Sequence, residues 1–168
     1  HLTPGAAPYR LGVGVDPRNP ASPGHLTLGP DSPVRGVATS GRHGRSLSLG
    51  IADSVTALAA DAPCADVAAT LIANAVDLPG DPAVTRAPAR SLLPDSDLGE
   101  RPVTTGLAPL TPAQTARALD AGEAAAHRML ARGLIRGAVL VLGDRVRILG
   151  EVPLETPETP SQRELAHA

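Results

Sequence analysis

Two short groups of oxygen-bearing side chains have the types and spacing that suit chemistry. Thr39, Ser40 and Gly41 end an apolar run with two hydroxyl groups and a glycine. Asp66 and Thr70 lie four residues apart in a segment with a helical pattern, so their side chains share one helix face. A carboxylate and a hydroxyl are hard oxygen ligands, and Mg²⁺ usually combines such ligands with waters and phosphates. This pair therefore indicates a Mg²⁺ site.

Both groups also have a plain structural interpretation. An Asp followed by a Thr four residues later is common, as a solvated pair or a local side-chain contact. A Thr-Ser-Gly sequence is typical of the turn at the end of a strand. A third group, Ser54-Val55-Thr56, follows Asp53. The order of all three groups along the chain is more informative than any of them alone.

Single residues near these groups leave alternatives open. His43, with Arg42 and Arg45 beside it, could contact a phosphate or belong to a solvated loop. Cys64 falls on the apolar face of a predicted helix and is expected in the core. No base in the sequence indicates that this thiol is a nucleophile.

The elements that must position these residues can be read from periodicity. Alternating apolar residues and turn signals predict strands. The predicted strands cover residues 9–15, 25–28, 34–39, 46–51, 54–60, 138–142 and 145–149.

Two helices are predicted between these strands. One starts at Asp61, with Pro63 in its first turn, and ends by Asp77. The other starts at Thr111 with a capping-box pattern and runs to about residue 131. The fold class is therefore α+β, a mixed sheet with packed helices.

Two segments lack a periodic pattern. Residues 80–105 are predicted to form a long irregular loop that serves as a lid or contacts a partner. Residues 151–168 are rich in Pro, Glu and Thr and are predicted to form a disordered tail.

Three motifs in order resemble a known family. They are A-T-S-G at residues 38–41, S-x-S-x-G-x-A-D-x-V-T at 46–56 and A-D-x-A-A-T at 65–70. Roughly residues 8–150 resemble the C-terminal half of the ApbE-type FAD:protein FMN transferases, and most closely their shorter ApbE-like relatives from bacteria and archaea.

The resemblance implies a fold, a cofactor and site residues. The fold would be ApbE-like and related to the T-fold, with residues 1–150 forming the C-terminal portion of one domain whose N-terminal part is missing. Asp66 and Thr70 would hold Mg²⁺, while Thr39, Ser40 and Gly41 would lie near bound FAD or a related flavin nucleotide. The activity would be transfer of FMN to a protein.

One departure from the family opens two other functions. The transferases carry an H-x-x-D-P-x-T-G segment, whereas this chain has Leu49-Gly50-Ile51-Ala52-Asp53 at that place. The alternatives are a degenerate, non-catalytic ligand-binding or accessory protein, and an unrelated small-molecule enzyme on the same fold.

Composition restricts the partners. The net charge is −2 and Tyr9 is the only aromatic residue, which argues against nucleic-acid binding. The longest apolar runs are too short to span a membrane, and a signal peptide is not visible, which favours a cytoplasmic location. The expected partners are a small-molecule nucleotide, the missing N-terminal segment or a partner chain, and a second copy in a homodimer.

Overall fold

Three antiparallel sheets and three helices form the described part of the chain. The computed structural model describes residues 7–14 and 24–155. Strands β1 (Tyr9–Gly12), β2 (His25–Leu28) and β9 (Leu154–Glu155) form one sheet in the order β1-β2-β9. Strands β3 (Gly36–Ser40), β4 (Ser54–Ala59), β7 (Gly137–Leu142) and β8 (Arg145–Gly150) form a second sheet in the order β3-β4-β7-β8. The α+β class is confirmed, but every described strand pair is antiparallel, so the expected mixed sheet is not found.

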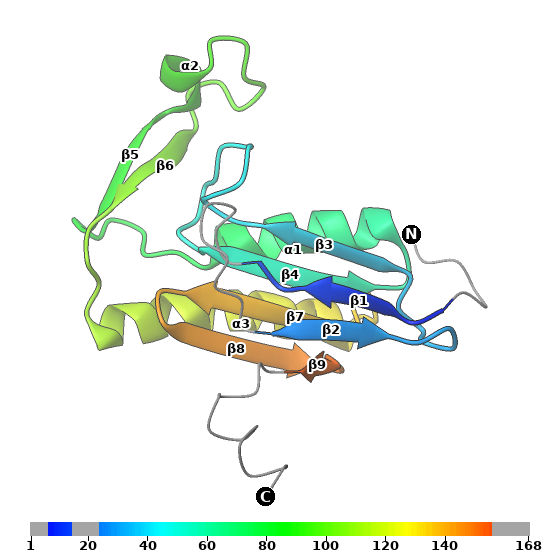
Figure 1. The fold of residues 1–168 in the computed structure, drawn as a ribbon. Coiled ribbons are helices and arrows are strands. Elements are labelled where there is room, and N and C mark those ends of the chain that lie inside the picture. Colours follow the sequence, from blue (N-terminus) through cyan, green and yellow to red (C-terminus); the bar gives the residue numbers. More distant parts are fainter. Residues whose placement is uncertain (1–6, 15–23, 156–168) are drawn as a thin grey trace, which may run out of the picture.

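The four-stranded sheet is the middle of three layers. Helices α1 (Ala62–Ala75) and α3 (Pro112–Ala131) cover one of its faces, and the three-stranded sheet covers the other (Figure 1). Residues of β4 alternate between the two sides: Val55 and Ala57 belong to the core beneath the helices, and Leu58 belongs to the core between the sheets. Because both faces of the sheet are covered, every residue of β4 and β7 is buried, and most of them are apolar.

Helix α1 packs on the sheet through small residues. Its N-cap is Asp61, whose carboxylate accepts a hydrogen bond from the Cys64 backbone N–H at 2.7 Å. The buried face consists of Ala65, Ala68, Ala69, Ile72 and Ala73. This alanine face lets the helix backbone approach the sheet closely.

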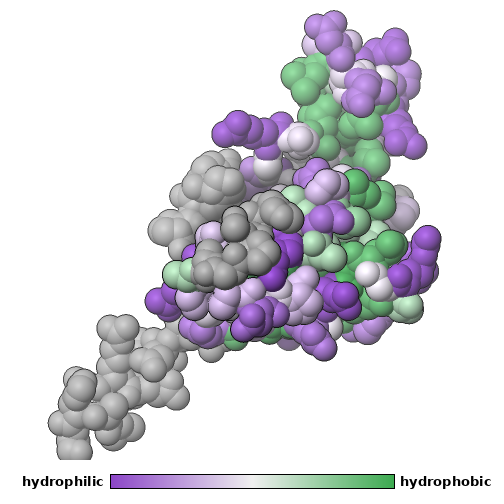
Figure 2. Space-filling view, turned by 90° about the vertical axis from the view of Figure 1, so that its right-hand side faces the viewer, coloured by the Kyte–Doolittle hydropathy of each residue, from purple (hydrophilic) through white to green (hydrophobic). Residues whose placement is uncertain are grey.

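The expectation that Cys64 lies in the core is wrong. The thiol is exposed, as are Val67 and Leu71 on the same side of α1. They line an apolar groove of about 270 Å³ between α1 and the end of α3. Figure 2 shows hydrophobic residues exposed on the body of the molecule. Large apolar residues were expected to face inward, but the alanines occupy the positions against the sheet.

Residues 80–105 are not an irregular loop. They contain β5 (Val84–Pro88) and the short helix α2 (Ala89–Leu92), and β6 (Pro102–Leu107) begins near their end. Residues 84–107, called the arm below, project from the body (Figure 1). A bulge between Thr85 and Arg86 breaks the alternation, and prolines stand at Pro88 and Pro102. These features hide the period of two that identifies strands in sequence.

Two further predictions differ from the structure. Residues 46–51 are irregular rather than a strand, because their backbone groups bond to α1 and to the arm. Leu154 and Glu155, expected in the disordered tail, pair with β2. Residue 15 and residues 156–168 lie outside the described residues.

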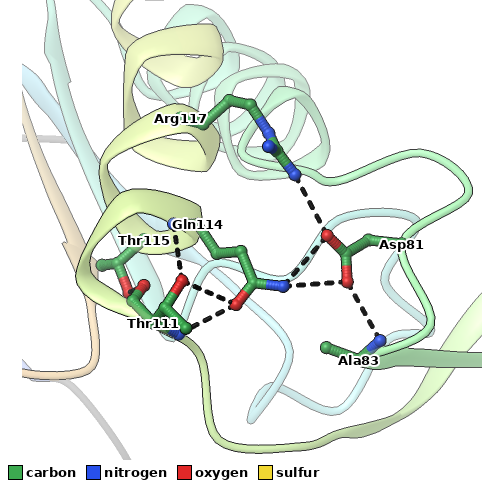
Figure 3. A network of polar contacts seen from close by, with 6 residues as sticks. All are labelled: Asp81, Ala83, Thr111, Gln114, Thr115 and Arg117. Carbon is green, nitrogen blue, oxygen red and sulfur yellow. Dashed lines mark hydrogen bonds and ion pairs between the residues drawn. The ribbon is translucent and has the colours of Figure 1, made fainter.

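The base of the arm is tied to the start of α3 by Asp81 (Figure 3). Its carboxylate accepts hydrogen bonds from the Ala83 N–H and the Gln114 amide, both at 3.1 Å, and pairs with Arg117 at 3.0 Å. Gln114 also completes the capping box with Thr111, as the sequence predicted. The Ala83 N–H, then Gln114 and Arg117, hold the pKa of Asp81 below its ordinary value.

We expect the Asp81 contacts to contribute stability only above acidic pH. Because the folded-state pKa is lowered, the contribution is present above the unfolded pKa of about 3.9 and is lost as pH falls through the folded value. Asp81→Asn should lower the melting temperature at pH 7 by roughly 2–4 °C. Thermal melts from pH 7 to pH 2.5 check this: the difference between variant and wild type should shrink on acidification. A difference that stays constant with pH would contradict it.

Candidate functional site

A polar cavity lies where β3, the following loop and α1 meet. Its volume is about 250 Å³. Its lining residues come from the end of β3, from the glycine- and serine-rich loop and from one face of α1. They are Thr39, Ser40, Gly41, Gly44, Arg45, Ser46, Leu47, Ser48, Asp66, Thr70 and Asn74. The structure thus brings all five sequence-predicted site residues to one cavity, called the polar cavity below.

The helix wall of the polar cavity is a row of three polar side chains. Asp66, Thr70 and Asn74 are spaced four residues apart, so they lie on one face of α1. Neighbouring members of the row are about 6 Å apart along the helix axis. Asp66 and Thr70 are exposed, and Asn74 is half-buried. A carboxylate and a hydroxyl are therefore open to a ligand entering the cavity.

The strand wall is formed where β3 ends. The Thr39 hydroxyl is 2.8 Å from the Thr56 hydroxyl on the adjacent strand β4, and both residues also line a separate pocket beside β1 and β2, so this hydroxyl already has a partner. A Cβ atom at Gly41 would lie 2.3 Å from the Asp53 carbonyl oxygen. Only glycine lets the chain turn here beside β4, so Gly41 keeps the start of the loop close to the sheet.

The loop wall is held by backbone contacts on two sides. The Leu49 N–H donates to the Asn74 side chain at 3.1 Å, and the Ile51 N–H donates to the Val76 carbonyl at 2.8 Å. On the arm side, the Thr104 N–H donates to the Ser48 carbonyl at 2.8 Å. These contacts give the irregular loop a defined shape.

Arg86, on the arm, connects the arm to the loop and to the end of α1. Its guanidinium group donates to the Leu49 carbonyl, the Asp77 carboxylate and the Thr104 hydroxyl. The arm, the loop and the end of α1 therefore meet at one cation next to the polar cavity.

Asp53 organises the other end of the loop. Its side chain is 8% exposed, and one carboxylate oxygen accepts from Arg42 Nε at 2.8 Å and lies 3.1 Å from His43 Nε2. The other oxygen accepts from the Gly143 N–H, in the turn between β7 and β8, at 2.6 Å. Asp53 thus fastens the loop to the central sheet.

This arrangement separates the basic residues of the loop. Arg42 and His43 bind Asp53 and are not among the residues that line the polar cavity, whereas Arg45 is. Arg42, His43 and Arg45 were the candidates for a phosphate contact. Of these three, Arg45 is the one that lines the polar cavity and could bind an anion there.

Two residues that line the polar cavity carry oxygen atoms of the kind that can ligate a metal ion. Among residues 7–14 and 24–155, the structure contains no cluster of three or more His, Cys, Asp or Glu side chains that could hold a metal by itself. Asp66 and Thr70 supply two hard oxygen atoms. Such an incomplete set fits Mg²⁺, which keeps waters and is usually completed by substrate phosphates.

Cys64 lines the apolar groove between α1 and the end of α3 and does not line the polar cavity. The hydrogen bond between its side chain and Asp61 raises the pKa of the Cys64 thiol. A raised pKa disfavours the reactive thiolate. Cys64 is therefore no part of the polar cavity and is not poised as a nucleophile.

Sequence reasoning did not select Asn74, Ser46 or Ser48. The signal for Asn74 was available, because it continues the four-residue spacing of Asp66 and Thr70. The serines fell in a segment predicted to be a strand, in which Ser46 and Ser48 share one face and Leu47 lies on the other. In the structure all three line the polar cavity, which depends on the irregular path of the loop.

The fold and the cavity define an α+β protein with a cavity between a glycine-containing loop and a helix. A family model described as AbpE bacteria matches residues 2–149, so the chain belongs to that family. The resemblance to the ApbE-type FAD:protein FMN transferases is therefore wrong: the matching family has a similar name but is a different one. No curated protein and no solved structure matches the chain.

Within the described ranges, no helix is both long enough and apolar enough to cross a bilayer.

Proposed function

We propose that this protein binds the diphosphate of a nucleotide together with Mg²⁺ in the polar cavity. The observation that carries the proposal is the pairing of two opposed walls. One wall offers the Asp66 carboxylate and the Thr70 hydroxyl, and the other offers Arg45 and a loop with two glycines and two serines. Oxygen ligands for Mg²⁺ thus lie opposite donors for an anion.

The size and lining of the cavity favour recognition of the diphosphate over recognition of a ring. A volume of about 250 Å³ is below the range of about 300–1,000 Å³ typical for pockets that enclose whole drug-sized ligands. The lining residues include no aromatic side chain on which a ring could stack. A flavin nucleotide such as FAD would therefore be held by its diphosphate, with its ring system outside the polar cavity.

A second candidate is ligand binding without transfer chemistry. The lining residues include no His, Cys, Tyr or Lys, and their one carboxylate is the proposed metal ligand. The cavity itself thus lacks a spare general base. An accessory protein that binds a nucleotide and releases it unchanged accounts for this lining.

Titration calorimetry with ADP and with FAD tests the proposal. We expect binding of both in the presence of Mg²⁺ and a loss of at least about 10-fold in affinity when EDTA removes the ion, because the metal would bridge Asp66 and the phosphates. A folded protein that binds neither nucleotide, or binds both equally well in EDTA, would contradict the proposal. Phosphorus NMR of the recovered nucleotide tests the second candidate, because an altered diphosphate would show that the protein does chemistry on its ligand.

A further inference from the structure

Asn74 is the third member of the polar row on α1, and its amide orientation is fixed by the backbone. The Asn74 Oδ1 atom lies 3.1 Å from the Leu49 backbone nitrogen. A backbone N–H can only donate, so the atom that meets it must be the amide oxygen and not the nitrogen. The NH₂ group of Asn74 is therefore on the other branch of the side chain.

The NH₂ group is left to face a ligand. Asn74 lines the polar cavity, and its amide nitrogen donates to no group in the described part of the chain. A half-buried amide with two unused donors is suited to an acceptor oxygen of a bound molecule. The part of the Asn74 side chain left for a ligand offers hydrogen-bond donors only, whereas the Asp66 carboxylate offers acceptors only.

Bracing of the loop alone does not account for Asn74. The loop also bonds to the C-terminal end of α1 through the Ile51 N–H and the Val76 carbonyl. Gly50 packs against the same helix end, where an added Cβ atom would lie 2.2 Å from the Ala73 carbonyl oxygen. These two contacts hold the loop beside α1 independently of the side chain of Asn74.

We infer that Asn74 is a specificity-determining residue, whose amide N–H groups bind an acceptor oxygen in the nucleoside half of the ligand. The inference rests on the proposed function. Asn74 lies about 6 Å beyond Thr70 and about 12 Å beyond Asp66 along the helix axis. A metal held by Asp66 and Thr70 places the diphosphate at that end of the row. The part of the ligand that reaches Asn74 is then the sugar next to the diphosphate, because the ring lies outside the polar cavity.

Two variants separate ligand recognition from bracing. Asn74→Asp keeps an oxygen acceptor for the Leu49 N–H and removes the donors. Asn74→Ala removes both and adds no charge. Calorimetry with Mg²⁺ would compare pyrophosphate, ADP and FAD as probes, and thermal melts would report folding.

We expect both variants to bind ADP and FAD with about 10-fold lower affinity, which corresponds to the loss of one hydrogen bond. Their affinity for pyrophosphate should change by less than about 3-fold. Asn74→Asp should melt at the wild-type temperature, because the contact with Leu49 remains. The inference is overturned if either variant binds ADP with wild-type affinity, or if the affinity for pyrophosphate falls as much as the affinity for ADP. Wild-type protein that binds none of the three probes would instead refute the proposed function, and the inference with it.

Discussion

Asp53→Ala is expected to destabilise the fold by about 3 kcal/mol. The carboxylate is buried and accepts from Arg42, His43 and the Gly143 N–H. Removing it leaves the guanidinium group of Arg42 without its counter-ion and the Gly143 N–H without an acceptor. Urea denaturation measures the loss, and Asp53→Asn, which keeps one oxygen acceptor, should lose less.

Asp144→Ala is the matched control for this prediction. Asp144 follows Gly143 in the turn between β7 and β8, but its side chain is 91% exposed. Substitutions at such positions usually change stability by less than about 0.5 kcal/mol. If Asp53→Ala were no more destabilising than Asp144→Ala, Asp53 would not be the residue that fastens the loop to the sheet.

Asp66→Ala is expected to remove Mg²⁺-dependent nucleotide binding while leaving the fold intact. Asp66 is the one carboxylate that lines the polar cavity, and it is exposed at the helix surface. Loss of the metal-ligating carboxylate should weaken ADP binding about as much as removal of the ion by EDTA does, by at least about 10-fold, because Asp66 would act through the metal. The melting temperature should stay close to that of the wild type, because an exposed side chain contributes little stability.

Asp95→Ala serves as the control for the change of charge. Asp95 is an exposed residue of the arm and does not line the polar cavity. The control should bind ADP with wild-type affinity. Equal weakening in Asp66→Ala and Asp95→Ala would point to the net charge of the protein and contradict the assignment of Asp66 as a metal ligand.

The sequence predicts the parts of the polar cavity that depend on local geometry. Asp66 and Thr70 share a helix face because four residues make slightly more than one helical turn. Thr39, Ser40 and Gly41 were expected at a strand end, and β3 does end at Ser40. Both helix starts were also predictable, because Asp61 and Thr111 are capping residues that act within three positions of themselves.

The parts that were not predicted depend on contacts between distant residues. Asp53 and Gly143 are brought together only by the pairing of β4 with β7. The arm was missed because a bulge and two prolines interrupt the alternation of its strands. The burial of α1 was assigned to the wrong side, because an alanine face is a weak signal beside Val67 and Leu71, which point outward.

Anomalous diffraction tests the central claim most directly. Crystals of the full chain would be soaked with Mn²⁺ and ADP, because manganese replaces Mg²⁺ at oxygen sites and scatters anomalously. We predict one anomalous peak at coordination distance from the Asp66 carboxylate and the Thr70 hydroxyl, with the diphosphate between the metal and Arg45. A manganese peak elsewhere in the molecule, with ADP absent from the polar cavity, would contradict the account.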